Sequence, residues 1–308
     1  NLPIMSVEEV TKAKAFHESF PQYTQTPLAD LKEMAKFLGL GTVKVKDESY
    51  RFGLNAFKVL GGSYAIAKYI ADEMNVDVSE LPYSVLTSDE FAKKFKPATF
   101  FSATDGNHGR GVAWAANKLH QKSVIIMPKG STETRLNNIK AEGADAWISD
   151  VNYDECVREA AKLAAGVEHG VVVQDTAWEG YEKIPAWIMQ GYGTMALEAD
   201  AQFAERPTHV FVQAGVGSLA GAMVGYFANK YKDNPPVMVV VEAEAAACLY
   251  KGAVAADGNI RIVDGDMDTI MAGLACGEPN ITSWDILKNH VTCFIAADDI
   301  VAARGMRA

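Results

Sequence analysis

Short apolar runs alternate with longer segments of helical spacing along most of the chain. Runs such as SVIIMP and VMVVVE are almost wholly apolar, which is typical of parallel strands covered on both faces. The alanine-rich segments between them repeat apolar residues every three or four positions, as amphipathic helices do. The pattern predicts strands at Thr42–Asp47, Ala98–Ala103, Ser123–Met127, Val171–Gln174, Thr208–Gln213 and Val237–Glu242, and helices at Gly61–Glu73, Gly109–Leu119, Thr132–Ala141, Tyr153–Ala164, Ile184–Phe203 and Leu219–Lys230.

Strands that alternate with helices predict an α/β protein with mostly parallel sheets flanked by helices. The polar stretch Asp77–Lys96 is the best candidate for a connection between two lobes, because it separates the first helical segment from a run of strand–helix units. A second, softer boundary falls at Gly180–Tyr192, where the helical pattern is continuous.

Composition and charge exclude several classes of protein. Among 308 residues the formal net charge is −10, and no basic stripe is long enough to attract a phosphate backbone, so a nucleic-acid partner is not expected. No apolar run reaches the roughly 20 residues that span a bilayer, and the first residues lack the layout of a signal peptide. The four cysteines show no CxxC spacing, which favours reduced thiols and a cytoplasmic location. No histidine pattern indicates a metal site.

Lys58 is the first candidate for chemistry. It lies at the entry to a predicted helix, between apolar neighbours and just before Gly61 and Gly62. A lysine amine is nucleophilic only when deprotonated, and burial near a helix N-terminus is expected to lower its pKa. The alternative is a helix-end lysine that extends into solvent.

A second candidate is the glycine-rich turn AGVGSLAGAM, which follows an apolar strand. The backbone N–H groups of Gly215 to Leu219 could bind a phosphate at the start of the next helix. The same glycines could serve only close helix–strand packing. A rival interpretation is a dinucleotide site, with Glu242 at the end of the next strand as the ribose-binding acid.

The third candidate is the turn SATDGNHG, again between a strand and a helix. Side chains and backbone donors meet there and could bind a substrate carboxylate, although an aspartate or asparagine at such a turn also caps helices. Asp175 ends a further apolar strand, where the sites of α/β proteins gather, but it could equally be a turn residue. The candidate side chains at the turn are Ser102, Thr104, Asp105, Asn107 and His108.

A lysine after an early strand, an asparagine turn and a late glycine loop, in that order, resemble the fold type II (tryptophan synthase β-like) pyridoxal-phosphate enzymes. Within that group the chain is similar to the diaminopropionate ammonia-lyase family over essentially its whole length. Asp105 precedes Gly-Asn where the wider group has a small residue, and this favours the lyase over a threonine or serine dehydratase. The strings that carry the resemblance are KDESYRFGLNAFKVLGG, TDGNHGRGVAWAA, VVQDTAWEGYEKIPAWIMQGY, QAGVGSLAGA and TIMAGLACGEPN.

The resemblance implies roles for these residues. Lys58 would hold pyridoxal 5'-phosphate as a Schiff base, and Asn107 would contact the ring hydroxyl. Asp105 and Asp175 would face an amino-acid substrate, 2,3-diaminopropionate, which is converted to pyruvate and ammonia. The fold would be a homodimer of two-lobed chains, with residues 1–85 and 190–308 in the large cofactor-binding domain and residues 86–189 in the small domain. The phosphate would lie among Gly215, Val216, Gly217, Ser218 and Leu219.

Two further expectations concern the C-terminal third. Family members continue beyond the DDIVAARGMR segment, so we expect a missing C-terminal part that would contact the pyridine nitrogen. Without it, the cofactor should bind weakly and apolar surface at Val237–Glu242 should be exposed. Cys248 and Cys276 both follow strands or loops near one sheet edge, and we expect them to come close enough to pair under oxidation. Two alternatives remain open: an NAD-dependent oxidoreductase and a non-catalytic amino-acid-binding protein. Both would lack a covalent adduct on the lysine, which distinguishes them from a pyridoxal-phosphate enzyme.

Overall fold

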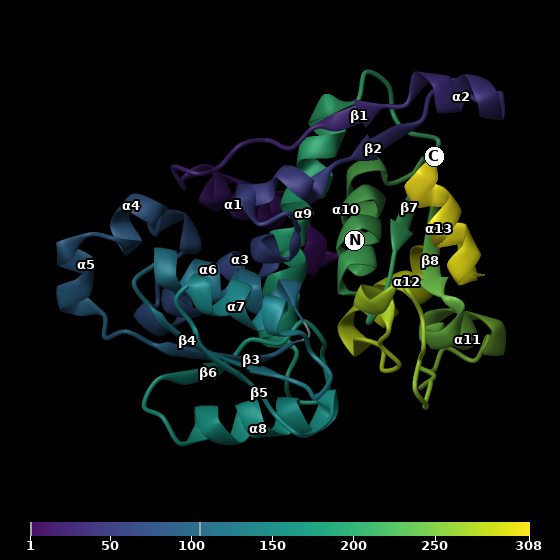
Figure 1. The fold of residues 1–308 in the computed structure, drawn as a ribbon. Helices are drawn as coiled ribbons and strands as arrows, with labels where there is room; N and C mark the ends of the chain where they lie inside the picture. Colours follow the sequence, from purple (N-terminus) through teal and green to yellow (C-terminus); the bar gives the residue numbers. More distant parts are fainter. Residues whose placement is uncertain (1, 105) are drawn as a thin grey trace.

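The computed structural model describes residues 2–104 and 106–308, which form three β-sheets with helices around them (Figure 1). All six predicted strands are present, with ends within two residues of those expected. Three more strands, β1, β5 and β9, were not predicted, and of these β1 and β5 have only three and four residues. The strands are β1 (Leu28–Asp30), β2 (Lys44–Lys46), β3 (Thr99–Ala103), β4 (Lys122–Met127), β5 (Asp145–Ile148), β6 (Gly170–Val172), β7 (His209–Gln213), β8 (Val237–Ala243) and β9 (Cys293–Ala297).

The six predicted helices are also confirmed, within three residues at each end. The helices that the pattern missed are mostly short, so they hold too few turns for a repeat to stand out. The helices are α1 (Val7–Glu18), α2 (Lys32–Leu38), α3 (Lys58–Met74), α4 (Tyr83–Leu86), α5 (Asp89–Lys94), α6 (Asn107–Lys118), α7 (Glu133–Ala141), α8 (Tyr153–Ala165), α9 (Lys183–Gln202), α10 (Ser218–Tyr231), α11 (Cys248–Ala255), α12 (Ile281–His290) and α13 (Asp299–Arg307).

The two larger sheets are parallel, as the apolar strands predicted. One has the order β5-β4-β3-β6 and the other β7-β8-β9. The expected strand at residues 42–47 instead pairs antiparallel with β1, in a small two-stranded sheet beside α2. Figure 1 shows this pair and α2 at the upper edge of the molecule, on the side opposite the four-stranded sheet.

The four-stranded sheet buries both of its faces. Successive side chains of a strand point to opposite faces. Phe100 and Ile125 accordingly join the main core, whereas Phe101 and Ile126 join a smaller cluster against α8. Figure 1 shows α8 on one side of this sheet and α6 on the other. Coverage of both faces explains why these strands are apolar without alternation.

Helix α9 lies at the centre of the molecule and packs against α1, α3 and α10. It follows the four-stranded sheet in the chain and precedes the three-stranded sheet. The expected connection at residues 77–96 is not an open linker, because it contains α4 and α5. Residues 86–189 include the whole four-stranded sheet, and we propose this range as the small domain.

A buried ion-pair network fixes the segment that leads to Lys58. The Arg51 guanidinium is fully buried and donates two hydrogen bonds of 2.8 Å to the Glu198 carboxylate on α9. Lys46 adds a contact of 2.7 Å to the same carboxylate. Burial alone would raise the pKa of Glu198, but these cations lower it to about 2. Paired bidentate geometry of this kind orients both partners as well as stabilising them.

Exposed apolar surface in the three-stranded sheet does not fall where it was expected. Strand β8 is the middle strand, and Met238 and Val240 are buried, so the expectation of exposure at residues 237–242 is wrong. The outer strands carry the exposed side chains instead, with Phe211 66% and Ile295 37% exposed. Among the described helices, none combines the length and apolar character that crossing a bilayer requires.

Candidate active site

Lys58 is the first residue of α3, as the sequence predicted. The two glycines that follow permit close packing. A Cβ on Gly61 would lie 2.6 Å from Ile188 and from the Tyr192 ring, and one on Gly62 would lie 3.2 Å from Val112 of α6. The glycines of this motif therefore let α9 and α6 approach the first turn of α3 and hold Lys58 between them.

The Lys58 amine makes an ion pair with Asp175. Its Nζ lies 2.5 Å from Asp175 Oδ2, and the two side chains are 29% and 9% exposed. Burial acts to lower the pKa of Lys58, but the Asp175 carboxylate outweighs it and holds that pKa above its usual range. The expected lowering by burial and a helix end is therefore wrong for the cofactor-free chain. Burial acts to raise the pKa of Asp175, but Lys58 and His108 outweigh it and hold that pKa well below its usual range.

The strand that precedes Asp175 is fixed by two side chains. The hydroxyl of Tyr181 accepts a hydrogen bond of 2.8 Å from the Gln174 N–H and donates one of 2.9 Å to the Val172 carbonyl. The Gln174 side chain bonds both backbone groups of Ala103, at 3.1 and 2.9 Å, as a strand partner would. Asp175 thus begins a turn whose base is held on both sides.

The glycine loop lies against Asp175. The Ser218 hydroxyl donates a hydrogen bond to the Asp175 backbone carbonyl and accepts one of 2.8 Å from Asn280. Gly217 has a φ of 104°, which side chains rarely adopt. The N-cap residue Gly217 has no side chain to cap α10, so the first N–H groups of this helix suit an anion. Gly215, Val216 and Leu219 are half-buried around this turn.

The asparagine turn is only partly described, and Asp105 lies outside the described residues. Ser102 is buried and donates to the Gln174 side chain at 3.2 Å. Thr104 accepts from the N–H groups of Gly106 and Gly109, at 3.0 and 3.2 Å, and so shapes the turn itself. Asn107 is the exposed first residue of α6.

His108 connects this turn to Asp175. Its Nε2 lies 2.9 Å from the Val173 carbonyl and must donate to it, because a carbonyl only accepts. Its Nδ1 then lies on the side of Asp175, 3.9 Å from Oδ2. The structure therefore brings Lys58, Asp175, Ser218 and His108 together.

Two tyrosines beside this cluster were missed by the sequence reading. Tyr192 is 1% exposed, and its hydroxyl has no hydrogen-bond partner among the described residues. Tyr153 accepts a hydrogen bond from Gln174. Lys58 and Asp175 both influence the pKa of each phenol. Tyr192 ends the string VVQDTAWEGYEKIPAWIMQGY, but neither tyrosine lies in one of the three candidate turns, so no local chemistry separated them from core aromatics.

The dinucleotide alternative loses its acidic residue. Glu242 is buried and accepts hydrogen bonds of 2.9 and 2.7 Å from the N–H groups of Leu249 and Tyr250. It therefore caps the start of α11 rather than facing a ribose. Over residues 2–104 and 106–308, no cluster of three or more His, Cys, Asp or Glu side chains could hold a metal ion.

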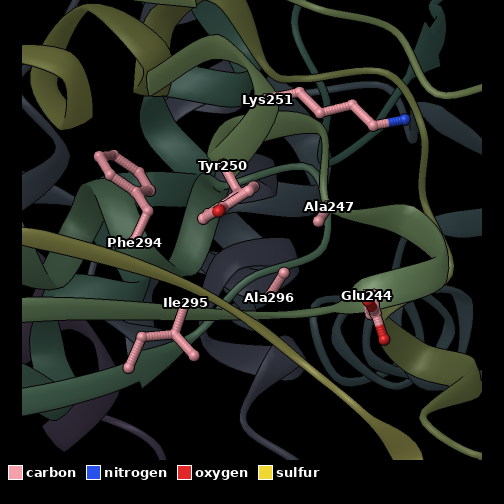
Figure 2. Close-up of a pocket in the computed structure, with 7 residues that line it drawn as sticks. All are labelled: Glu244, Ala247, Tyr250, Lys251, Phe294, Ile295 and Ala296. Atoms are coloured by element: carbon pink, nitrogen blue, oxygen red, sulfur yellow. The ribbon is translucent and has the colours of Figure 1, made fainter. Parts of the chain in front are cut away.

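A separate groove of about 620 Å³ lies between α11 and β9. Figure 2 shows Tyr250 and Phe294 in it, with the charged ends of Glu244 and Lys251 extending in different directions. Neither Lys58 nor Asp175 lines this groove. It is therefore distinct from the candidate site.

Cys248 and Cys276 approach each other as expected. The Cys248 thiol lies 3.7 Å from the Cys276 carbonyl oxygen, and neither cysteine is in a disulfide. A Cβ on Gly215 would lie 3.5 Å from the Cys276 sulfur, so this pair borders the glycine loop. The disulfide itself stays a prediction.

The residues present fit pyridoxal phosphate. The start of α10 behind Gly217 suits the phosphate, and Lys58 would hold the aldehyde. Both lie against Asp175, which pairs with Lys58 through its side chain and with Ser218 through its carbonyl. The buried Tyr192 hydroxyl next to them lacks a partner within the described chain, and an unpaired buried hydroxyl is costly unless a bound group satisfies it.

Comparisons with known proteins agree with this site. Residues 20–308 match the family model described as pyridoxal-phosphate dependent enzyme. The chain is 54% identical to the diaminopropionate ammonia-lyase of Salmonella typhimurium, over 95% of this chain and 73% of the relative. It is 48% identical to that of Escherichia coli K12, over 99% and 76%. The crystal structure of the E. coli enzyme in complex with D-serine has a TM-score of 0.90 at 46% identity and covers the same shares. The chain therefore belongs to the diaminopropionate ammonia-lyase family of pyridoxal-phosphate dependent enzymes.

Proposed function

We propose that this chain is a pyridoxal-phosphate ammonia-lyase that converts 2,3-diaminopropionate to pyruvate and ammonia. The observation that carries the proposal is the contact between Lys58 and Asp175 beside the glycine loop. It places a lysine nucleophile, a carboxylate and an anion-binding helix start at one point. The named relatives, each a diaminopropionate ammonia-lyase, support the choice of substrate.

Lys58 is proposed to hold the cofactor and to act as a base. When bound, pyridoxal phosphate supplies an electron sink that acidifies the α-carbon of the attached amino acid. Lys58 must lose its proton before it can act as a nucleophile, and Asp175 is the partner that stabilises the protonated amine. Once displaced by substrate, the lysine amine is free on one face to accept the α-proton.

The two carboxylates are proposed to serve the leaving amine and the second face. Asp175 stays ionised and could hold a β-ammonium group, which disfavours a hydroxyl substrate such as serine in the same orientation. Asp105 could accept the α-proton of the opposite enantiomer. Ser102, Thr104, Asn107 and His108 shape the turn where we propose that the substrate carboxylate lies.

The function is tested by turnover of both enantiomers of 2,3-diaminopropionate, with pyruvate and ammonia measured together. We expect two molecules of ammonia for each pyruvate, because the β-amino group leaves in the elimination and the α-amino group leaves on hydrolysis. Release of ammonia from serine should be much slower. A protein that carries the cofactor on Lys58 but releases ammonia only from threonine or serine would support the dehydratase alternative instead.

A homodimer and a cytoplasmic location are further proposals. Support for the homodimer comes from apolar side chains beside the small β1–β2 sheet, where Phe37 is 87% and Leu40 54% exposed. Self-association would bury such a patch. Light scattering at several concentrations tests the homodimer.

Support for the cytoplasm comes from four cysteines that form no disulfide, since reduced thiols suit that compartment. Cell fractionation tests the location.

A further inference from the structure

Tyr153 is held by a side chain whose orientation is fixed. The Gln174 Oε1 accepts from the backbone N–H of Ala103 at 3.1 Å and from the Ser102 hydroxyl. Because an N–H can only donate, this end of the amide must be the oxygen. The amide nitrogen therefore faces the Ala103 carbonyl, at 2.9 Å, and the Tyr153 hydroxyl.

This orientation decides what the Tyr153 hydroxyl can do. Its oxygen accepts the hydrogen bond from Gln174, so its own hydrogen is directed away from that amide. Gln174 is 1% exposed and immediately precedes Asp175. The Tyr153 hydroxyl bonds the side chain of the residue before Asp175, so the phenol lies near the candidate site, and Lys58, Asp175 and Cys276 all act on its pKa. Burial raises that pKa well above its usual range, so the phenol keeps its hydrogen.

We propose that Tyr153 is a substrate-binding residue whose hydroxyl, oriented by Gln174, donates a hydrogen bond to the α-carboxylate of the amino-acid substrate. The inference rests on the proposed function and adds to it a residue from α8. A carboxylate is the group that a neutral donor near the Lys58 cation would bind. Tyr153 then contributes to binding and leaves proton transfer to the carboxylates and Lys58.

The chain offers a matched control for this residue. Tyr181 is a second phenol that bonds the Gln174 segment, but its partners are the Gln174 N–H and the Val172 carbonyl. Tyr153→Phe and Tyr181→Phe each remove one buried hydroxyl next to Gln174. The Tyr181 hydrogen is already donated to the Val172 carbonyl, whereas we infer that the Tyr153 hydrogen is available to the substrate.

The experiment compares both variants as cofactor-loaded enzymes with two ligands. A hydrogen bond to a charged group corresponds to a roughly 10- to 100-fold change in affinity. For Tyr153→Phe we expect the KM for 2,3-diaminopropionate and the calorimetric Kd for D-serine to rise by that factor, with kcat little changed. Inhibition by 1,2-diaminoethane, which lacks the carboxylate, should not change. Tyr181→Phe should alter none of these values more than a few-fold.

Three results would overturn the proposal. These are an unchanged KM and Kd, an equal loss of affinity for 1,2-diaminoethane, and an equal loss in Tyr181→Phe. A fall in kcat alone would assign Tyr153 to the chemical step and also reject carboxylate binding. Wild-type protein that binds D-serine through Tyr153 without turning over diaminopropionate would refute the proposed function only. Wild-type protein that binds neither amino acid would refute both.

Discussion

Lys58 Nζ lies 2.5 Å from Asp175 Oδ2, although 117 positions separate the two residues in the chain. Asp175 accepts this contact while its backbone carbonyl accepts from Ser218. One aspartate therefore joins the start of α3, the end of the four-stranded sheet and the start of α10. The candidate site lies where these two helix starts and this end of the sheet meet.

Removing Lys58 should affect both chemistry and stability. Lys58→Ala should abolish turnover and covalent attachment of cofactor. It should also lower the free energy of unfolding by about 1–3 kcal/mol, because the buried Asp175 carboxylate loses its partner. Lys58→Arg should recover stability without activity, since an arginine keeps the charge but is not a usable nucleophile. Borohydride reduction followed by peptide mass analysis tests attachment, and turnover in Lys58→Ala would contradict the assignment.

Asp105→Asn should separate the two enantiomers of diaminopropionate. If Lys58 and Asp105 accept the α-proton from opposite faces, only one enantiomer loses its base. The expected loss in kcat/KM for that enantiomer is on the order of 10²-fold or more. Steady-state kinetics with each pure enantiomer measures the ratio. Equal losses would reassign Asp105 to recognition of the carboxylate or ammonium.

Gly61→Ala should be destabilising although alanine favours helices. The new methyl group would meet Tyr192 and Ile188 at 2.6 Å, and such overpacking costs about 1–3 kcal/mol. Gly305→Ala in α13 is the control, because nothing lies within 4 Å of that position. It should stabilise the chain by up to about 1 kcal/mol. Urea unfolding of both variants measures the difference, and a neutral Gly61→Ala would disprove the packing argument.

Glu242 should make stability depend on pH near neutrality. Burial raises its pKa from 4.5 to about 7, although backbone N–H groups from α11 partly oppose this. Because the folded-state pKa is raised, its contribution is fully present below about pH 4.5 and is lost as pH rises through 7. Wild type should therefore lose up to about 3 kcal/mol relative to Glu242→Gln by pH 8. Melting curves of both proteins between pH 5 and 8 measure this difference. A difference in stability that stays constant over this range would exclude the role of Glu242.

Mild oxidation should link Cys248 to Cys276. The Cys248 thiol lies 3.7 Å from the Cys276 carbonyl, but burial raises its pKa to about 12, so thiolate formation and oxidation should be slow at neutral pH. The bond should appear in peptide maps of oxidised wild type and be absent from Cys248→Ser. Persistence of all four free thiols under an oxidant that reaches Cys276 would contradict the prediction.

The sequence by itself determined the architecture and most of the motifs. Wholly apolar strands require cover on both faces, and this identified the parallel sheets before any coordinates. Turns with restricted chemistry, such as the one at Gly217, could also be recognised, because their backbone shape depends on local residues. Short elements such as β1 and α4 were missed, since a few residues carry too little periodicity.

Only the tertiary structure decided how these motifs act together. The pKa of Lys58 was expected to fall because of local burial, yet the carboxylate of Asp175, which follows the four-stranded sheet, raises it. Apolar side chains were expected to be exposed on β8 but are exposed on β7 and β9 instead. The order of the strands, and not their apolar character, determines which strand is central. Tyr153 and Tyr192 lie beside the site, although the amino-acid pattern singled out neither of them. Charge pairing and hydrogen-bond direction depend on distances between residues far apart in the chain, and a linear pattern contains no such distances.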